Sequence, residues 1–215
     1  MAVTDTRERL IARAQRLEYL TIAWNTVEML AAVFAGVLAG SMALKGFGLD
    51  SGIEALSGAA LLWRLRQDRD PKRRAHAEKT ALRVVGLSFV VLALYVAERA
   101  THAMVARTHP AESLLGIAVA VAALIVMPLL AHAKRRVAVA IQSGALKADS
   151  RQSEFCAYLS LILLGGLALN AWQGWWWADP LAALTMAAMI GKEGIEALTA
   201  EKDAPRSKFR ASRLR

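Results

Sequence analysis

Long apolar stretches separated by short polar connections make up most of this chain. A helix needs about 20 mainly apolar residues to cross a bilayer, so stretches of this length predict membrane-spanning helices. Six stretches qualify, at about 17–44, 46–63, 84–104, 114–133, 145–171 and 181–198. The second is the weakest, because Asp50 and Glu54 interrupt it. The pattern predicts an all-α integral membrane protein with six transmembrane helices.

The basic residues gather in four segments, 7–16, 64–83, 134–151 and 192–215, which hold 24 of the 27 Lys and Arg residues. With six spans, all four segments fall on one side of the membrane, and the positive-inside rule makes that side the cytoplasm. We therefore expect both termini to be cytoplasmic. The expected division is a basic N-terminal segment 1–16, a six-helix domain 17–199 and a basic tail 200–215.

Composition narrows the class of protein. With 56% hydrophobic residues and a mean hydropathy of +0.34, the chain is too apolar for an ordinary soluble domain. The net charge of +9 follows from membrane orientation, so the lipid bilayer is the expected partner and nucleic acid is not. The expected location is the cell (inner) membrane, as a multi-pass protein. Small residues in the apolar stretches would allow a homodimer.

Acidic residues within apolar stretches indicate function, because a charge at bilayer depth costs about 2.5–3.5 kcal/mol. Asp50 and Glu54 are spaced i, i+4, which places both carboxylates on one helical face. Like charges at that spacing repel each other. A shared divalent cation or a shared proton would offset the repulsion. Helix-end acids reaching the interface are the alternative for Asp50.

The start of the fifth stretch carries a second polar stripe. Its members share one helical face at i, i+3, i+4 and i+7, and are Asp149, Gln152, Ser153 and Cys156. Glu154 points away from that face. Oxygen and sulfur donors together suit a borderline ion such as zinc. The single cysteine excludes a disulfide scaffold, and a lone membrane cysteine can also be a small apolar filler.

Three further residues are candidates for a proton relay or for ligands where the ion enters. Glu28 lies in the middle of the first stretch, and His76 and Glu78 flank the start of the third. An interhelical hydrogen bond for Glu28 and solvated loop positions for the other two are the alternatives. Enzyme motifs are missing: there is no Gly-rich phosphate loop, nucleophile elbow or helical zincin motif.

Several segments resemble the membrane domain of the cation diffusion facilitator family. Its second helix, where an acidic pair at i, i+4 binds metal, is similar to G-F-G-L-D-S-G-I-E-A-L-S-G. The start of its third helix resembles R-A-H-A-E-K-T-A-L, and its fifth and sixth helices resemble K-A-D-S-R-Q-S-E-F-C and W-W-W-A-D-P-L-A-A-L. The resemblance covers about residues 10–200. The chain resembles the tail-less branch of the family, which is expected to consist of the membrane domain without the cytoplasmic C-terminal domain.

The resemblance implies metal/proton antiport by alternating access, with the ion held between the second and fifth helices. Where the family's fifth helix usually has His and Asp, this chain has Gln152 and Cys156. The expected ligand set is Asp50, Glu54, Asp149 and Cys156, with Gln152 and Ser153 as lesser donors. Zinc is the expected substrate, with Mn, Fe, Co or Cd as alternatives, and protons are the expected coupling ion.

Two other functions stay open at the level of sequence. A membrane subunit could hold metal, or serve as a scaffold, without transporting anything. An intramembrane enzyme is disfavoured, because Cys156 has no basic His on its own helix to activate it. The prediction is therefore a secondary active transporter and not an enzyme.

Overall fold

The computed structural model describes residues 2–66, 71–141 and 144–203, and the side chains of most of them. All regular secondary structure within these ranges is helical. The elements are α1 (Ala2–Ala39), α2 (Met42–Arg66), α3 (Pro71–Val105), α4 (Leu114–Ala140), α5 (Gly144–Gln173) and α6 (Ala178–Asp203). The prediction of six helices is confirmed.

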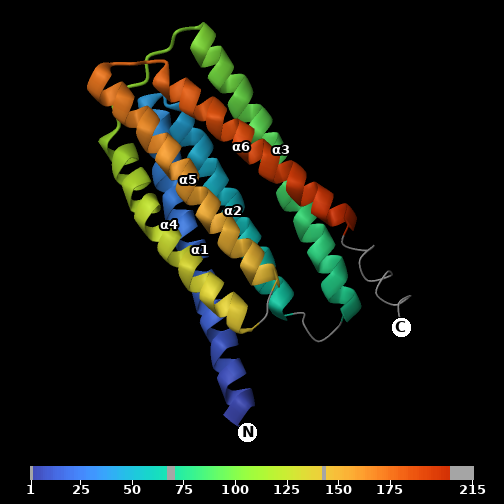
Figure 1. Ribbon diagram of the computed structural model, residues 1–215. Coiled ribbons are helices and arrows are strands. Elements are labelled where there is room, and N and C mark those ends of the chain that lie inside the picture. The colour runs from blue at the N-terminus through green and yellow to red at the C-terminus, as the bar shows by residue number, and fades with distance from the viewer. Residues whose placement is uncertain (1, 67–70, 142–143, 204–215) are drawn as a thin grey trace.

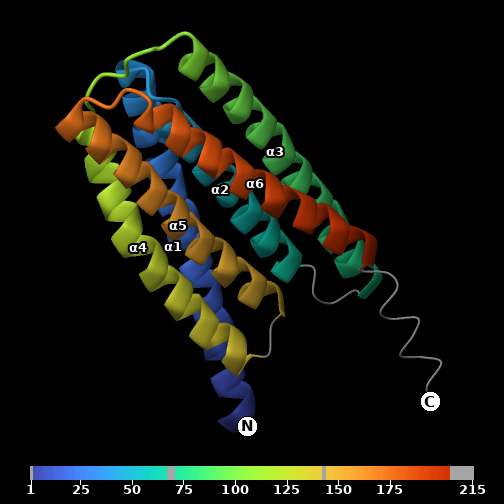
Figure 2. The ribbon, with the colours of Figure 1, turned by 45° about the horizontal axis from the view of Figure 1, so that its top comes forward.

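The helices run up and down alongside one another in two groups. α1, α2, α4 and α5 form a four-helix group, whereas α3 and α6 pair with each other and lie against α2 (Figures 1 and 2). α2 contacts α1, α3, α5 and α6, and so it is the most central helix. Residues carried by α2 are therefore shielded by neighbours on several sides.

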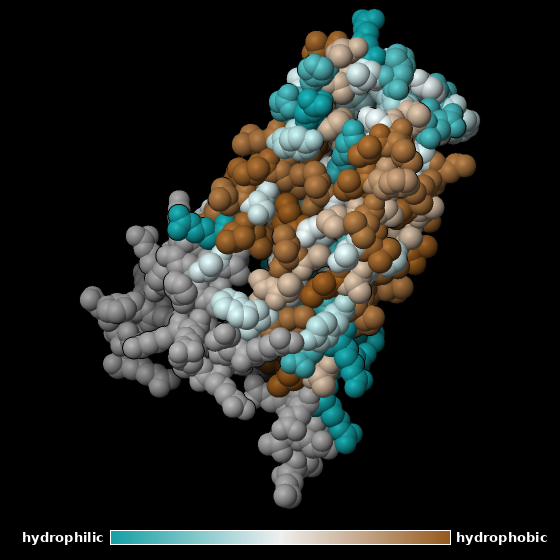
Figure 3. Space-filling model, turned by 180° about the vertical axis from the view of Figure 1, so that it is seen from behind, coloured by the Kyte–Doolittle hydropathy of each residue, from teal (hydrophilic) through white to brown (hydrophobic). Residues whose placement is uncertain are grey.

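The two ends of the helix array differ in chemistry. The end where α1 begins, and where α2 and α4 finish, is called the basic end (Figure 1). Its described basic residues include Arg13, Arg16, Arg135, Arg136, Lys147 and Arg151. The opposite end is called the aromatic end, and it carries Trp172, Trp175, Trp176 and Trp177. On the face seen in Figure 3 the surface between the ends is mainly apolar, with hydrophilic residues towards both ends.

Four helical segments are long and apolar enough by themselves to cross a membrane: Arg9–Ala39, Arg83–Val105, Leu114–Ala140 and Asp149–Gln173, all within the described residues. α2 and α6 do not reach this level, because charged residues interrupt them. Both pack against several other helices. Neighbouring protein can thus shield their polar groups from lipid, which a single-helix hydropathy measure does not register.

The boundary between the first two helices differs from the expected one. The first apolar stretch was expected to continue to residue 44, but α1 ends at Ala39, and Gly40 has a φ of 69°. Glycine adopts this left-handed conformation without steric cost, so it ends the helix after a continuous apolar run. Lys45, expected in a connection, lies instead inside α2.

The start of α2 is held by a residue 137 positions later in the chain. Asp179, at the beginning of α6, accepts a hydrogen bond from the Met42 backbone N–H through Oδ2 (2.9 Å) and another from Ser41 Oγ through Oδ1. Ser41 Oγ in turn accepts from the Leu44 N–H (3.0 Å). A side-chain oxygen and a carboxylate at a helix N-terminus satisfy its free N–H groups and complement its dipole. This cap ties α2 to α6.

Glycine allows α5 and α6 to approach closely at one position. A Cβ on Gly166 would lie 2.7 Å from the Ala182 Cβ and 3.2 Å from the Ala178 carbonyl oxygen. The adjacent Gly165 has nothing within 4 Å of an added Cβ. The two neighbours therefore form a matched pair, in which only Gly166 is required for helix packing.

Substituting Gly166 by Val should lower the free energy of unfolding by about 1–3 kcal/mol, the usual range for overpacking. Gly165→Val adds the same atoms where there is room and should cost much less. Thermal unfolding of both variants in detergent checks this. Equal losses of stability in the two variants would contradict the close α5–α6 contact.

Candidate metal centre

The buried face of α1 is polar in one half and apolar in the other. Towards the basic end it carries Glu18, Thr21, Asn25 and Glu28, each at most 2% exposed. Their spacing of three, four and three residues follows a single helical face. The same face continues towards the aromatic end only with alanines, namely Ala32, Ala35 and Ala39. The polar half of α1 thus faces protein, where partners can compensate its charges.

α2 presents its acidic pair to this face. Asp50 and Glu54 are each 2% exposed, and Ser51 between them is fully buried. Ser51 Oγ donates a hydrogen bond to Glu28 Oε2 (3.2 Å), which joins α1 to α2. The alternative of Asp50 reaching the interface is therefore wrong, because its side chain is enclosed by other helices.

α5 approaches the acidic pair from the other side. Ser153 Oγ donates to Glu54 Oε1 (3.3 Å), and the Cys156 thiol lies beside the Glu54 carboxylate. Both α5 side chains are at most 1% exposed. We call the combined set the polar interior, and its members are Glu18, Asn25, Glu28, Asp50, Ser51, Glu54, Lys134, Asp149, Ser153 and Cys156.

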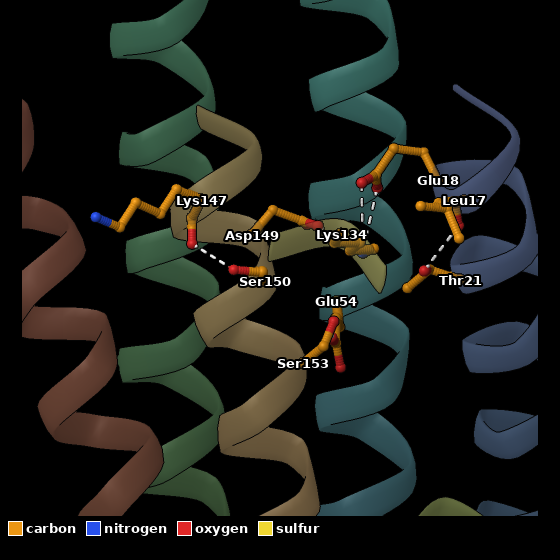
Figure 4. A network of polar contacts seen from close by, with 9 residues as sticks. All are labelled: Leu17, Glu18, Thr21, Glu54, Lys134, Lys147, Asp149, Ser150 and Ser153. Carbon is orange, nitrogen blue, oxygen red and sulfur yellow. Dashed lines mark hydrogen bonds and ion pairs between the residues drawn. The ribbon is translucent and has the colours of Figure 1, made fainter. Parts of the chain in front are cut away.

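An ion-pair network forms the part of the polar interior that is nearest the basic end. Lys134 Nζ lies 2.5 Å from Asp149 Oδ2 and 3.4 Å from Glu18 Oε1 (Figure 4). Lys134 was expected in a basic loop. Instead, α4 continues to Ala140, and the side chain of Lys134 is fully buried. Because a lysine neutralises Asp149, this carboxylate is less available to a metal ion than the other predicted ligands.

Apolar residues fill the half of the four-helix group towards the aromatic end. Phe47, Leu159 and Leu163 are fully buried within it. The connection after α3 closes over this end: the Ala111 N–H donates to the Ala39 carbonyl (2.8 Å), and Asn170 Nδ2 donates to the Pro110 carbonyl (3.1 Å). Within the described part of the four-helix group, the fully buried charged side chains therefore lie in the centre and towards the basic end.

Several buried polar atoms in the centre have no hydrogen-bond partner among the described residues. They are Glu28 Oε1, Asp50 Oδ1, Glu54 Oε2 and both amide atoms of Asn25. Leaving a buried polar group unpaired costs about 1–3 kcal/mol, and more for a charged group. Three buried carboxylates with unpaired oxygens are chemically suited to bind cations or protons, which would remove this cost.

The predicted residues divide into three groups. Glu54, Ser153 and Cys156 come together at the α2–α5 contact, Glu28 reaches Ser51 from α1, and Asp50 is buried four residues before Glu54 on α2. Gln152 is partly buried next to Ser153 in the sequence, and Asp149 pairs with Lys134. The side chains of His76 and Glu78 lie outside the described residues. As predicted, Glu154 is directed elsewhere: it pairs with Arg135 at 3.1 Å on the surface.

The centre is not a fully assembled metal site. Among the described side chains, no three His, Cys, Asp or Glu residues lie close enough together to hold an ion. Carboxylates without a bound cation repel one another, so separation is their expected arrangement. Binding an ion would require the helices or side chains to draw these donors together.

Sequence reasoning missed four members of the polar interior: Glu18, Asn25, Ser51 and Lys134. The spacing of Glu18, Thr21, Asn25 and Glu28 was the available signal, because polar residues in a membrane helix define a face as clearly as apolar ones do in a soluble helix. For Lys134 the sequence offers no comparable signal. Two further basic residues follow it, so all three look like part of an exposed basic loop.

Several known proteins are similar to this chain in sequence. The family model described as "Cation efflux transmembrane domain" matches residues 19–200. The "Cation-efflux pump FieF" of Shewanella oneidensis is 26% identical over 196 residues, covering 87% of this chain and 63% of the relative. "Transmembrane protein 163" of Xenopus laevis is 26% identical over 187 residues, covering 86% of this chain and 66% of the relative.

A third relative, the "Uncharacterized transporter sll1263" of Synechocystis sp., is 28% identical over 156 residues, covering 70% of this chain and 50% of the relative. The chain thus spans between half and two thirds of the length of these relatives. The match to the family model extends over nearly all of the described helices, and it includes every member of the polar interior except Glu18. The chain is a multi-pass membrane protein that belongs to the cation efflux, or cation diffusion facilitator, family.

Proposed function

We propose that this chain transports a divalent transition-metal cation, with zinc as its main substrate, and that it exports the ion from the cytoplasm. The supporting observation is the group of buried carboxylates with unpaired oxygens at the contact of α1, α2 and α5. A relative named as a cation-efflux pump supports the same class of substrate. The proposed location is the cell (inner) membrane, with the basic end in the cytoplasm.

The proposed ligands are Asp50 and Glu54 from α2 and Cys156 from α5. Ser153 and Gln152 are lesser donors, and Glu28 is a third carboxylate, which Ser51 links to α2. A thiolate together with carboxylates favours zinc over magnesium or calcium. Asp149 leaves the proposed ligand set, because its oxygen is occupied by Lys134.

The direction of access follows from the two halves of the helix interior. Polar groups extend from the centre to the basic end, whereas apolar residues such as Phe47 and Leu159 separate the centre from the aromatic end. We propose that this arrangement receives ions from the cytoplasm. Release to the other side then requires a second arrangement, in which the apolar contacts around Phe47 open.

Proton coupling supplies the driving force in this proposal. An inside-negative potential opposes export of a divalent ion by about 4.6 kcal/mol per 100 mV. Carboxylates and a thiol bind metal only when deprotonated, so protons entering from outside would displace the ion. The same groups would then return protons to the cytoplasm.

Zinc flux into proteoliposomes tests the proposal. Protein reconstituted with its basic end outward should load zinc into the vesicle, and an acidic lumen should speed the uptake several-fold because protons leave in exchange. A zinc-sensitive dye in the lumen reports the flux. No zinc uptake above that of protein-free vesicles, with or without the gradient, would contradict transport.

A metal-binding or scaffolding role is the second candidate. The observation in its favour is that the donors do not form a closed cluster within the described residues. Zinc binding to the purified protein without any flux in the same vesicles would support this role over transport.

A further inference from the structure

Lys134 holds three helices together through charge. Its ammonium on α4 contacts Asp149 Oδ2 on α5 at 2.5 Å and Glu18 on α1 at 3.4 Å. The Lys134 and Glu18 side chains are fully buried, and that of Asp149 is 10% exposed. Figure 4 shows the lysine between its two partners, with Glu54 and Ser153 on the next part of the polar interior.

The polar interior contains more acidic than basic side chains. Its described members include five carboxylates and a single cation, Lys134. The carboxylates are those of Glu18, Glu28, Asp50, Glu54 and Asp149. Desolvating an ammonium is costly, and a buried ion pair is weak support for stability by itself. The presence of Lys134 is better explained by the electrostatic effect of its ammonium group on the neighbouring acidic side chains.

The lysine is linked to the proposed ligands along α5. Asp149 lies four residues before Ser153, and Ser153 donates directly to Glu54. An ammonium group has only hydrogen-bond donors, so it cannot be a metal ligand. It can, however, compensate negative charge and repel an incoming cation.

We propose that Lys134 is a tethered counter-cation that weakens the binding of the transported ion to Asp50, Glu54 and Cys156. The inference rests on the proposed function. When the ligands are empty, the ammonium compensates part of their charge and allows the helices to stay packed. When a divalent ion binds, the ammonium repels it, which keeps the affinity low enough for release on the other side.

The sign of the change in zinc affinity tests this role. Removing the charge with Lys134→Met should tighten zinc binding about tenfold, within the usual range of coupling between sites. Glu18→Gln removes a negative charge from the same network and should weaken binding by a similar factor. The double variant restores the charge balance and should bind zinc nearly as wild type does, and Lys134→Arg should as well. Calorimetric titration of zinc into protein in lipid nanodiscs measures all four.

A purely structural tie gives a different pattern. In that case Lys134→Met and Glu18→Gln both loosen the α1–α4–α5 contact, so each weakens zinc binding or leaves it unchanged. The double variant then binds zinc no better than either single variant. This pattern overturns the inference. If Lys134→Met does not fold, Lys134→Gln takes its place, because it also removes the charge but keeps a polar side chain; tighter zinc binding supports the inference, and unchanged or weaker binding overturns it.

The proposed function can be tested independently of the role of Lys134. If wild type binds zinc and Asp50→Asn abolishes that binding, the metal site stands whatever Lys134→Met does. If wild type binds no zinc in nanodiscs, the metal site and the counter-cation role are both wrong.

Discussion

Replacing Asp50 by Asn and Glu54 by Gln together is expected to abolish zinc transport and leave the helical fold intact. Each change removes a charged ligand worth about 1.5–3 kcal/mol, so the pair should cost on the order of 100-fold or more in zinc binding. The amides keep the shape of the side chains. They also remove the repulsion between two buried like charges, so the free energy of unfolding should not fall.

The measurement is zinc uptake into proteoliposomes, with thermal unfolding of the same preparations as the test of folding. Glu154→Gln is the matched control, because Glu154 lies on α5 near the centre but pairs with Arg135 on the surface. It should transport as wild type does. Wild-type uptake by the Asp50→Asn, Glu54→Gln variant would refute the site on α2.

Replacing Asp179 by Ala is expected to give the largest loss of stability of any single change considered. The variant leaves the Met42 N–H and the Ser41 hydroxyl without their acceptor in a buried position. Losing a helix cap costs about 0.5–2 kcal/mol, and unpaired buried donors add to this, so we expect a loss of about 2–3 kcal/mol. Zinc affinity should fall too, because α2 carries the acidic pair two turns further along.

Thermal unfolding in detergent, with and without zinc, measures both effects. Asp179→Asn keeps one acceptor oxygen and should lie between the wild type and Asp179→Ala. Thr185→Ala is the control on the same helix, since the Thr185 hydroxyl is exposed and donates to the Leu181 carbonyl of its own helix (2.9 Å). If Asp179→Ala were as stable as Thr185→Ala, the cap would not position α2.

Much of the fold could be predicted because it depends on local properties. Hydropathy and length located six helices, and the start of α4 was found at the expected residue, Leu114. The errors are at boundaries inside apolar sequence, such as the break at Gly40. Hydropathy does not change there, and only the backbone conformation ends the helix.

The candidate site could be predicted only in part. The i, i+4 spacing of Asp50 and Glu54 places them on one face of α2, and the spacing of Ser153 and Cys156 does the same on α5. The spacing does not show which residues of other helices face these side chains. Ser51 reaches Glu28 across 23 residues, and Lys134 reaches Glu18 across 116.

The sequence by itself determined the number of helices, the concentration of basic residues at one end and the presence of buried acids on α2. Those features follow from the helical period and from the cost of charge in lipid, which act within a single helix. Only the tertiary structure decided that Asp149 pairs with Lys134, that Asp179 caps α2 and that the buried charged side chains of the described four-helix group extend from the centre towards the basic end. Such contacts join helices distant in sequence, and their partners are chosen by how the helices pack, which no local pattern encodes.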